Sequence, residues 1–207
     1  MKEITLSSDA KKELEDIYSE LQKEYERVAG ELEFSCSGCP DNCCDSYFLH
    51  HTYAEWAYLW EGVKALKQEE QDALIERATQ YLSDCDAAMA RDERPQVMCP
   101  VNHDGLCQLY KHRLLVCRTH GVPAKMTRPD GQSMQFPGCF RCQDIVEEKG
   151  LKDVLVPVER TPLLRRLAGL ENNLLYMKRH LHPKVKLTIA EMLVKGPPKL
   201  SFGCGEE

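Results

Sequence analysis

The chain has 207 residues, of which 43% are hydrophobic and 29% are charged, and its formal net charge is −6. This composition fits one globular domain with enough apolar side chains for a core, and the negative charge argues against general binding to nucleic acid. The first residues lack the apolar run of a signal peptide, and no stretch is as long and apolar as a membrane-spanning helix. We therefore expect a cytoplasmic protein without membrane contact, in a compartment where thiols stay reduced.

Three helices are expected in the first part of the chain. Apolar residues recur every three or four positions from Ser8 to Glu33, which predicts a long helix with one buried stripe. Thr52 and Glu55 form a capping box, which marks the start of a second helix. A third helix is expected from Gln68 to Ala90.

Residues 97–142 are rich in turns and cysteines, and the sequences Asn-His-Asp-Gly and Arg-Pro-Asp-Gly predict one or two short hairpins there. Helical patterns return after residue 143, where Thr188 and Glu191 form another capping box. The expected fold is mainly α, a helical frame around an irregular cysteine-rich centre. We expect a single domain, 1–207, with an N-terminal helix (1–33), a metal-binding region (34–142) and a C-terminal helical segment (143–207).

The sequence contains 11 cysteines, and nine of them fall into two short segments. Clustered thiols in a reducing compartment indicate a metal site rather than disulfides. Cys36-x2-Cys39 and Cys139-x2-Cys142 have the spacing with which two sulfurs reach one metal ion. The nine candidate metal ligands are Cys36, Cys39, Cys43, Cys44, Cys99, Cys107, Cys117, Cys139 and Cys142. Cys85, on the apolar face of its helix, is expected in the core.

Cys43 and Cys44 are neighbours, and neighbouring side chains diverge in both extended and helical backbone. We expect them to serve two centres, or to divide into one ligand and one packed thiol. Nine thiols also exceed the four ligands of one tetrahedral site. Two four-coordinate centres or one polynuclear centre are therefore favoured over a single zinc. His120, three residues after Cys117, is a further candidate ligand or supporting group.

Several known motifs do not fit the spacing. The run from Cys36 to Cys44 differs from the bacterial ferredoxin motif and from that of radical S-adenosylmethionine enzymes, and a thioredoxin-like pair lacks the βαβ pattern it needs. No Ser-His-Asp order, phosphate-binding glycine loop or H-E-x-x-H helix occurs. We assign no catalytic residue, and enzymatic activity stays open.

The stretch from Gly105 to Pro129 is basic, with five Lys or Arg residues and no Asp or Glu. It is a candidate surface for an anionic ligand or a protein partner. The alternative is that basic and acidic segments pack beside one another within the chain.

Roughly residues 34–142 resemble the CxxCxxCC zinc- or iron-chelating family, the YkgJ-type cysteine-cluster proteins. The shared motifs are "CSGCPDNCC", "TYAEWAYL" and "MCPVNHDGLCQLYKHRLLVCRTHG", in which Cys99-Pro100, Cys107, Leu109-Tyr110, Arg113 and Cys117-Arg118 match the family block. Two positions depart: three residues separate Cys39 from Cys43 where the family usually has two, and Leu114 replaces the usual proline. The resemblance implies a metal-binding domain that takes zinc or iron, an iron–sulfur cluster included.

Three hypotheses about function follow. The chain is a metal-stabilised binding module, an iron–sulfur redox protein or enzyme, or a metal storage or delivery protein. A structural zinc site predicts metal-dependent folding, a cluster predicts redox activity, and storage predicts labile, partial occupancy. Some longer members of the family that the chain resembles are linked to N-methylation of flagellin lysines. No separate methyl-donor site is visible in this sequence, so that activity is not carried over, and a protein-modifying, methylase-related enzyme is kept only as a form of the second hypothesis.

Overall fold

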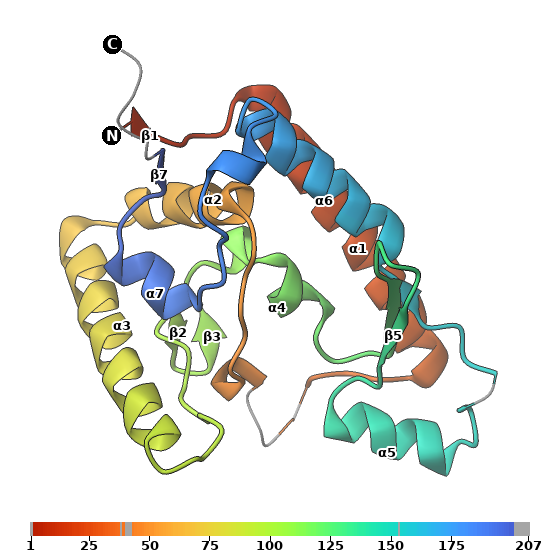
Figure 1. Ribbon diagram of the computed structural model, residues 1–207. Helices are drawn as coiled ribbons and strands as arrows, with labels where there is room; N and C mark the ends of the chain where they lie inside the picture. The colour runs from red at the N-terminus through yellow and green to blue at the C-terminus, as the bar shows by residue number, and fades with distance from the viewer. Residues whose placement is uncertain (1, 38, 40–42, 153, 201–207) are drawn as a thin grey trace. The chain divides into compact units, whose positions relative to one another are not determined.

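A computed structural model describes residues 2–37, 39, 43–152 and 154–200 (Figure 1). Within these residues the fold is mainly helical, with seven α-helices and only small sheets, as predicted. None of the described helices has the length and apolar content needed to cross a membrane.

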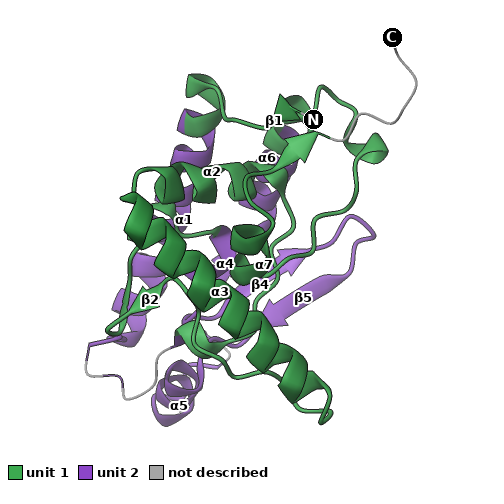
Figure 2. Cartoon of the chain, turned by 90° about the vertical axis from the view of Figure 1, so that its left-hand side faces the viewer, with its two compact units in different colours: residues 1–11, 44–114, 170–207 green, residues 12–43, 115–169 purple. Residues whose placement is uncertain are grey.

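The chain packs into two compact units, and each is assembled from segments that are distant in sequence (Figure 2). Unit 1 consists of Met1–Lys11, Cys44–Leu114 and Leu170–Glu207, and unit 2 of Lys12–Cys43 and Leu115–Gly169. The cysteine-rich region predicted at 34–142 is thus shared between the two units.

Unit 2 contains most of the first helix, α1 (Ser8–Leu32), which matches the predicted range. Its apolar stripe is buried at Leu14, Ile17, Tyr18, Leu21, Val28 and Leu32. The first part of α6 (Thr161–Leu174) lies alongside α1 (Figure 1). There the Arg166 guanidinium forms ion pairs with Glu13, at 2.9 Å, and with Glu20.

The rest of unit 2 is a small three-stranded sheet with two short helices, α4 (Leu115–Thr119) and α5 (Phe140–Glu148). β4 (Ala124–Thr127) pairs antiparallel with β5 (Ser133–Phe136) and parallel with β6 (Val158–Glu159). The β4–β5 hairpin turns at Arg-Pro-Asp-Gly, where Gly131 has a φ of 85°. This confirms the second predicted hairpin.

Unit 1 contains α2 (Tyr53–Lys64), α3 (Gln68–Met89) and α7 (Ile189–Val194). Both predicted N-caps are present, and Thr188 and Glu191 form the full capping box. The Thr52 hydroxyl accepts a hydrogen bond from the Glu55 backbone N–H at 3.1 Å, and the Thr188 hydroxyl accepts one from Glu191 at 3.2 Å. These bonds satisfy backbone donors that the first turn of a helix leaves free.

The core of unit 1 forms where α2, α3 and α7 meet. α2 is buried on almost every side, as expected of a helix that is apolar around its circumference. The indole N–H groups of Trp56 and Trp60 both donate to the Met192 carbonyl, at 3.1 and 2.9 Å, which ties α2 to α7. Cys85 is buried in this core, as predicted.

Short elements complete unit 1. β1 (Lys2–Glu3) pairs with β7 (Lys199–Leu200), and β2 (Asn102–His103) pairs with β3 (Leu106–Cys107), both antiparallel. The β2–β3 turn contains Asp104 and Gly105 with φ values of 51° and 81°, the left-handed pair that a two-residue hairpin loop requires. The first predicted hairpin is therefore confirmed.

Candidate metal centre

The nine candidate thiols divide between the two units. Unit 2 contains six of them: Cys36, Cys39, Cys43, Cys117, Cys139 and Cys142. Unit 1 contains the other three: Cys44, Cys99 and Cys107. The neighbours Cys43 and Cys44 thus belong to different units.

The two C-x2-C pairs of unit 2 come from the chain that follows α1 and from the start of α5. The Cys39 backbone N–H donates to the Cys36 carbonyl at 3.1 Å, so the first pair sits in a tight turn. Cys139 is the N-cap residue of α5, and Cys142 is in the first turn of that helix with 0% of its surface exposed. Local structure therefore shapes each pair separately.

Tyr25, on α1, lies among these thiols. The pKa of its hydroxyl responds to three of these thiols, Cys36 first and then Cys139 and Cys43. Burial, reinforced by these neighbouring thiols, raises the pKa of the Tyr25 hydroxyl well above its ordinary value. Thiols from both C-x2-C pairs are therefore within electrostatic reach of one phenol.

Gly121 allows this close approach. A Cβ atom at Gly121 would lie 2.6 Å from the Tyr25 hydroxyl oxygen, and the φ of Gly121 is 128°, a conformation that only glycine adopts readily. Its carbonyl also accepts the Cys139 N–H at 3.0 Å. Gly121 therefore lies between the Tyr25 hydroxyl and the N-cap residue of α5, Cys139.

Arg141, between Cys139 and Cys142, provides positive charge. Its interactions with the thiols, that of Cys39 first and then Cys36 and Cys139, raise the pKa of Arg141. Its Nη1 atom is buried and has no hydrogen-bond partner within the described residues.

The Cys142 thiol shows the effect of burial. Burial, followed by the charges of Cys139 and Cys36, raises the pKa of Cys142 to about 12. Several thiols that crowd together cannot all ionise without a compensating cation. Binding of a divalent cation deprotonates such thiols and releases their protons.

The donor chemistry of unit 2 suits a thiophilic metal, since sulfur ligands select zinc, copper(I) or iron–sulfur clusters. Across the residues that the structure describes, no group of three or more His, Cys, Asp or Glu side chains is arranged to hold a metal ion. The thiols are therefore near one another in unit 2 without forming a coordination shell, and their role as ligands stays a prediction.

The three thiols of unit 1 lie near the β2–β3 hairpin. The Cys99 N–H donates to the Cys44 carbonyl at 2.9 Å, and the Cys99 carbonyl accepts from Asn102 at 2.9 Å, the residue that pairs with Cys107. Cys99 and Cys107 are partly buried against the unit 1 core. Backbone bonds therefore keep these three cysteines in one region of unit 1.

The histidines play varied parts. His120, the candidate ligand, follows α4 and donates its backbone N–H to Val116 at 3.1 Å. His50 is buried in unit 1, and its Nδ1 has no hydrogen-bond partner among the described residues. Burial and the neighbouring His51 lower the pKa of His50 to about 3, so it is neutral at physiological pH.

The basic stretch from Gly105 to Pro129 is largely occupied by contacts within each unit. Lys125 pairs with Glu159 at 3.7 Å and Arg128 with Asp130 at 3.2 Å. The Arg118 guanidinium stacks on the Tyr18 ring at 4.4 Å, and that of Arg113 on Tyr110 at 5.0 Å. An anionic ligand or partner at this stretch stays a prediction and would compete with these contacts.

Sequence reasoning did not identify Tyr25 and Arg141 as site residues. Tyr25 fits the apolar stripe of α1, so its sequence pattern indicates only packing. Arg141 could have been noticed, because a cation inside a C-x2-C pair lies close to its thiols. The comparisons add no further assignment: the chain matches no protein-family model, no curated protein and no solved structure.

Proposed function

We propose that unit 2 is a metal-binding module that holds zinc or iron on thiolates from its two C-x2-C pairs. The proposed ligands are Cys36, Cys39, Cys139 and Cys142, with Cys43 and Cys117 as further candidates. The observation that carries the proposal is the position of Tyr25. Its hydroxyl lies against Gly121, whose carbonyl accepts the Cys139 N–H, and it interacts with Cys36 of the other pair.

Four thiolates would make a closed tetrahedral site, with metal–sulfur distances of about 2.3 Å for zinc. When bound, the metal would supply the positive charge that these crowded thiolates need. The chain's own contribution is to place the thiols, to bring the Tyr25 hydroxyl and the Arg141 guanidinium among them, and to bury Cys142. This arrangement suits a structural role in which the metal joins the end of α1 to α5.

An iron–sulfur redox protein is the second candidate. The potential of such a cluster depends on hydrogen bonds to its sulfurs and on burial. The Tyr25 hydroxyl and the Arg141 guanidinium both interact with these thiols. This polar surround favours a tuned cluster over a storage site, which needs labile ligands.

The decisive measurement is the metal and acid-labile sulfide content of the full chain, purified without oxygen. We expect about one zinc ion or one iron centre per chain, bound by unit 2. Zinc without sulfide supports the structural module, and iron with sulfide supports the redox protein. If the purified chain holds no metal and retains neither zinc nor iron after reconstitution, both the structural module and the redox protein are contradicted.

A double variant assigns the ligands. Cys36→Ser with Cys139→Ser removes one thiol from each pair, and we expect it to lose the unit 2 metal. Cys85→Ala is the matched control, because it removes a buried thiol from the unit 1 core and should leave the metal content unchanged. Full metal retention in the double variant would exclude these ligands.

Unit 1 provides a test of the two-centre alternative. Its three thiols would need one further ligand to complete a tetrahedral site. A chain with two metal ions that falls to one in the Cys99→Ser variant would support a second centre. If the number of metal ions per chain is the same in this variant as in the wild-type chain, the metal is confined to unit 2.

A further inference from the structure

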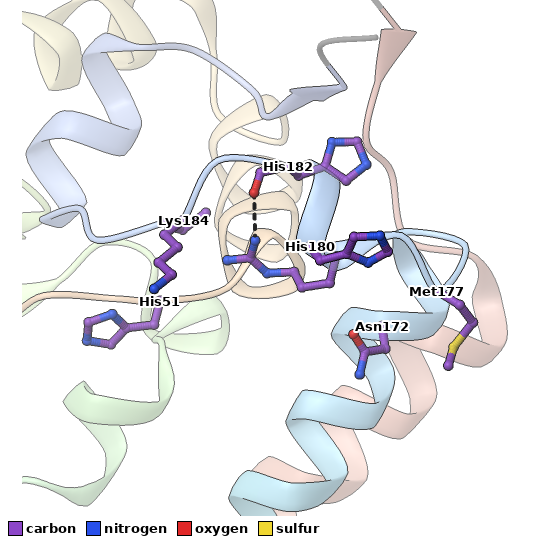
Figure 3. Close-up of a pocket in the computed structure, with 8 residues that line it drawn as sticks. His51, Asn172, Met177, His180, His182 and Lys184 are labelled. Carbon is purple, nitrogen blue, oxygen red and sulfur yellow. Dashed lines mark hydrogen bonds between the residues drawn. The ribbon is translucent and has the colours of Figure 1, made fainter. Parts of the chain in front are cut away.

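Unit 1 contains a pocket with a volume of about 540 Å³. This volume is within the roughly 300–1,000 Å³ of small-molecule sites. It is formed by the end of α6, by the 3-10 helix η3 (Arg179–Leu181) and by the chain on either side of residue 183 (Figure 3). The lining residues are His51, Asn172, Met177, Arg179, His180, His182, Lys184 and Val185.

The lining of this pocket is cationic, although the chain as a whole is acidic. Arg179 and Lys184 carry positive charge, and three imidazoles and the Asn172 amide add hydrogen-bonding groups. The lining includes no Asp or Glu, and within the described chain no ion pair involves Lys184. In Figure 3 the Lys184 side chain extends toward His51.

Among the described residues, the carboxylate that forms an ion pair with the lining also has partners outside the pocket. Glu171 contacts the Arg179 Nε atom at 3.4 Å. Its carboxylate also accepts the backbone N–H groups of Tyr53 and Ala54, at 2.9 and 3.0 Å, at the start of α2. A helix N-terminus favours negative charge, so Glu171 is compensated by α2 as well as by Arg179. It does not neutralise Lys184 or the imidazoles.

The loop that forms the pocket is held in place before any ligand binds. Arg179 Nη1 donates to the His182 and Pro183 carbonyls, at 3.1 and 3.2 Å, and its guanidinium stacks on the Tyr53 ring at 5.6 Å. The Tyr53 hydroxyl donates to the Pro183 carbonyl at 3.1 Å. Such preorganisation lowers the entropy that a ligand must overcome.

The rim of the pocket is strained. Tyr176 and Met177 are consecutive non-glycine residues with φ values of 53° and 61°, a conformation that raises the energy of each residue. Strain of this kind gathers at ligand sites, where the surrounding structure holds it in place. Met177 lines the pocket together with Val185, so the site has an apolar wall beside its cations.

We propose that this pocket binds a small molecule that carries a phosphate group. A phosphate offers several acceptor oxygens and up to two negative charges, which suits a pocket whose lining includes a lysine, an arginine and imidazoles. The apolar wall of Met177 and Val185 would accommodate the organic part of such a ligand. This site does not depend on the thiols of unit 2.

Titration calorimetry on the full chain, in its purified metal state and at constant ionic strength, tests the proposal. The probes are adenosine 5′-monophosphate, inorganic phosphate and adenosine. We expect both phosphates to bind. Tighter binding of the nucleotide indicates an organic phosphate, and equal binding indicates free phosphate. Adenosine that binds as tightly as the nucleotide, or phosphates that do not bind at millimolar concentration, would overturn the proposal.

Lys184→Met provides the residue-level test, because it removes the charge of an exposed side chain and keeps most of its stem. We expect the affinity for both phosphates to fall about tenfold, the loss that follows from one charge-assisted contact. Lys186→Met is the matched control, since Lys186 is exposed nearby but does not line the pocket. Equal phosphate affinity in Lys184→Met and the wild-type chain would overturn the proposal.

Discussion

Unit 1 is built around a continuous apolar core between α2, α3 and α7, whereas the part of unit 2 that carries α5 and the β4–β5 hairpin buries little apolar surface. In α5 the buried residue is Cys142, and no residue of β5 is buried. In α2, by contrast, most residues are buried. The two regions therefore differ in the kind of interaction available to stabilise them.

This difference suggests why thiols gather where the apolar core is thin. A helix with one buried residue gains little from the hydrophobic effect, which contributes about 25 cal/mol per Å² of buried apolar surface. Metal–thiolate bonds supply stabilisation that does not need a large core, as in small metal-dependent domains. The comparison predicts that metal matters to unit 2 and packing to unit 1.

Metal removal should produce the largest effect. Structural zinc contributes roughly 10–16 kcal/mol to folding in small domains, so a chelator under reducing conditions should unfold the α5 region of unit 2. Hydrogen exchange would report this as lost protection in α5 and β4. Both tryptophans of the chain, Trp56 and Trp60, are in unit 1, so the tryptophan emission should not change. A red shift of the tryptophan emission together with the loss of protection would contradict the prediction that metal stabilises unit 2 alone.

Leu114→Ala should destabilise unit 1 by about 2–5 kcal/mol, because removing a fully buried leucine side chain leaves a cavity. Leu114 has 0% of its surface exposed and belongs to the core. Urea unfolding followed by tryptophan emission measures the change. Leu106, which is 75% exposed, is the matched control, and Leu106→Ala should shift the free energy of unfolding by less than about 0.5 kcal/mol. If both substitutions lower the free energy of unfolding by similar amounts, the prediction that apolar packing stabilises unit 1 is contradicted.

Acid should weaken unit 1 through His50. Its folded pKa of about 3 lies below its ordinary value of 6.5, so below pH 6.5 the unfolded chain binds a proton that the folded chain does not. Stability is therefore lost as the pH falls from 6.5 toward 3, by up to about 1.4 kcal/mol per pH unit. Urea unfolding between pH 7 and 5 should show a loss of about 2 kcal/mol. His50→Leu should flatten this dependence, and an unchanged slope would show that other groups cause it.

Gly121→Ala should weaken unit 2 by about 2 kcal/mol, because the new Cβ would clash with the Tyr25 hydroxyl and the backbone would be strained. Metal content and hydrogen exchange in α5 would measure the effect. Adding Tyr25→Phe removes the clashing oxygen, so the double variant should recover part of the loss. No recovery would mean that backbone strain alone accounts for the effect.

Much of the fold could be predicted because its causes are local. The periodicity of α1, the N-caps at Thr52 and Thr188, and the turn residues of both hairpins each act over a few residues. Such signals depend on hydrogen bonds and dihedral angles that the neighbouring residues determine. The start of α5 at Phe140, four residues before the helical pattern expected near Asp144, has no comparable local mark.

The sequence by itself determined the helices, the caps, the hairpins and the grouping of nine thiols into two segments. Only the tertiary structure decided which thiols share a unit, and it separated Cys43 from Cys44, placed Tyr25 and Arg141 beside the C-x2-C pairs and buried His50. It also brought His51 to the same pocket as Lys184. These features depend on contacts between residues far apart in the chain, and no short-range pattern encodes which distant segments will pack together.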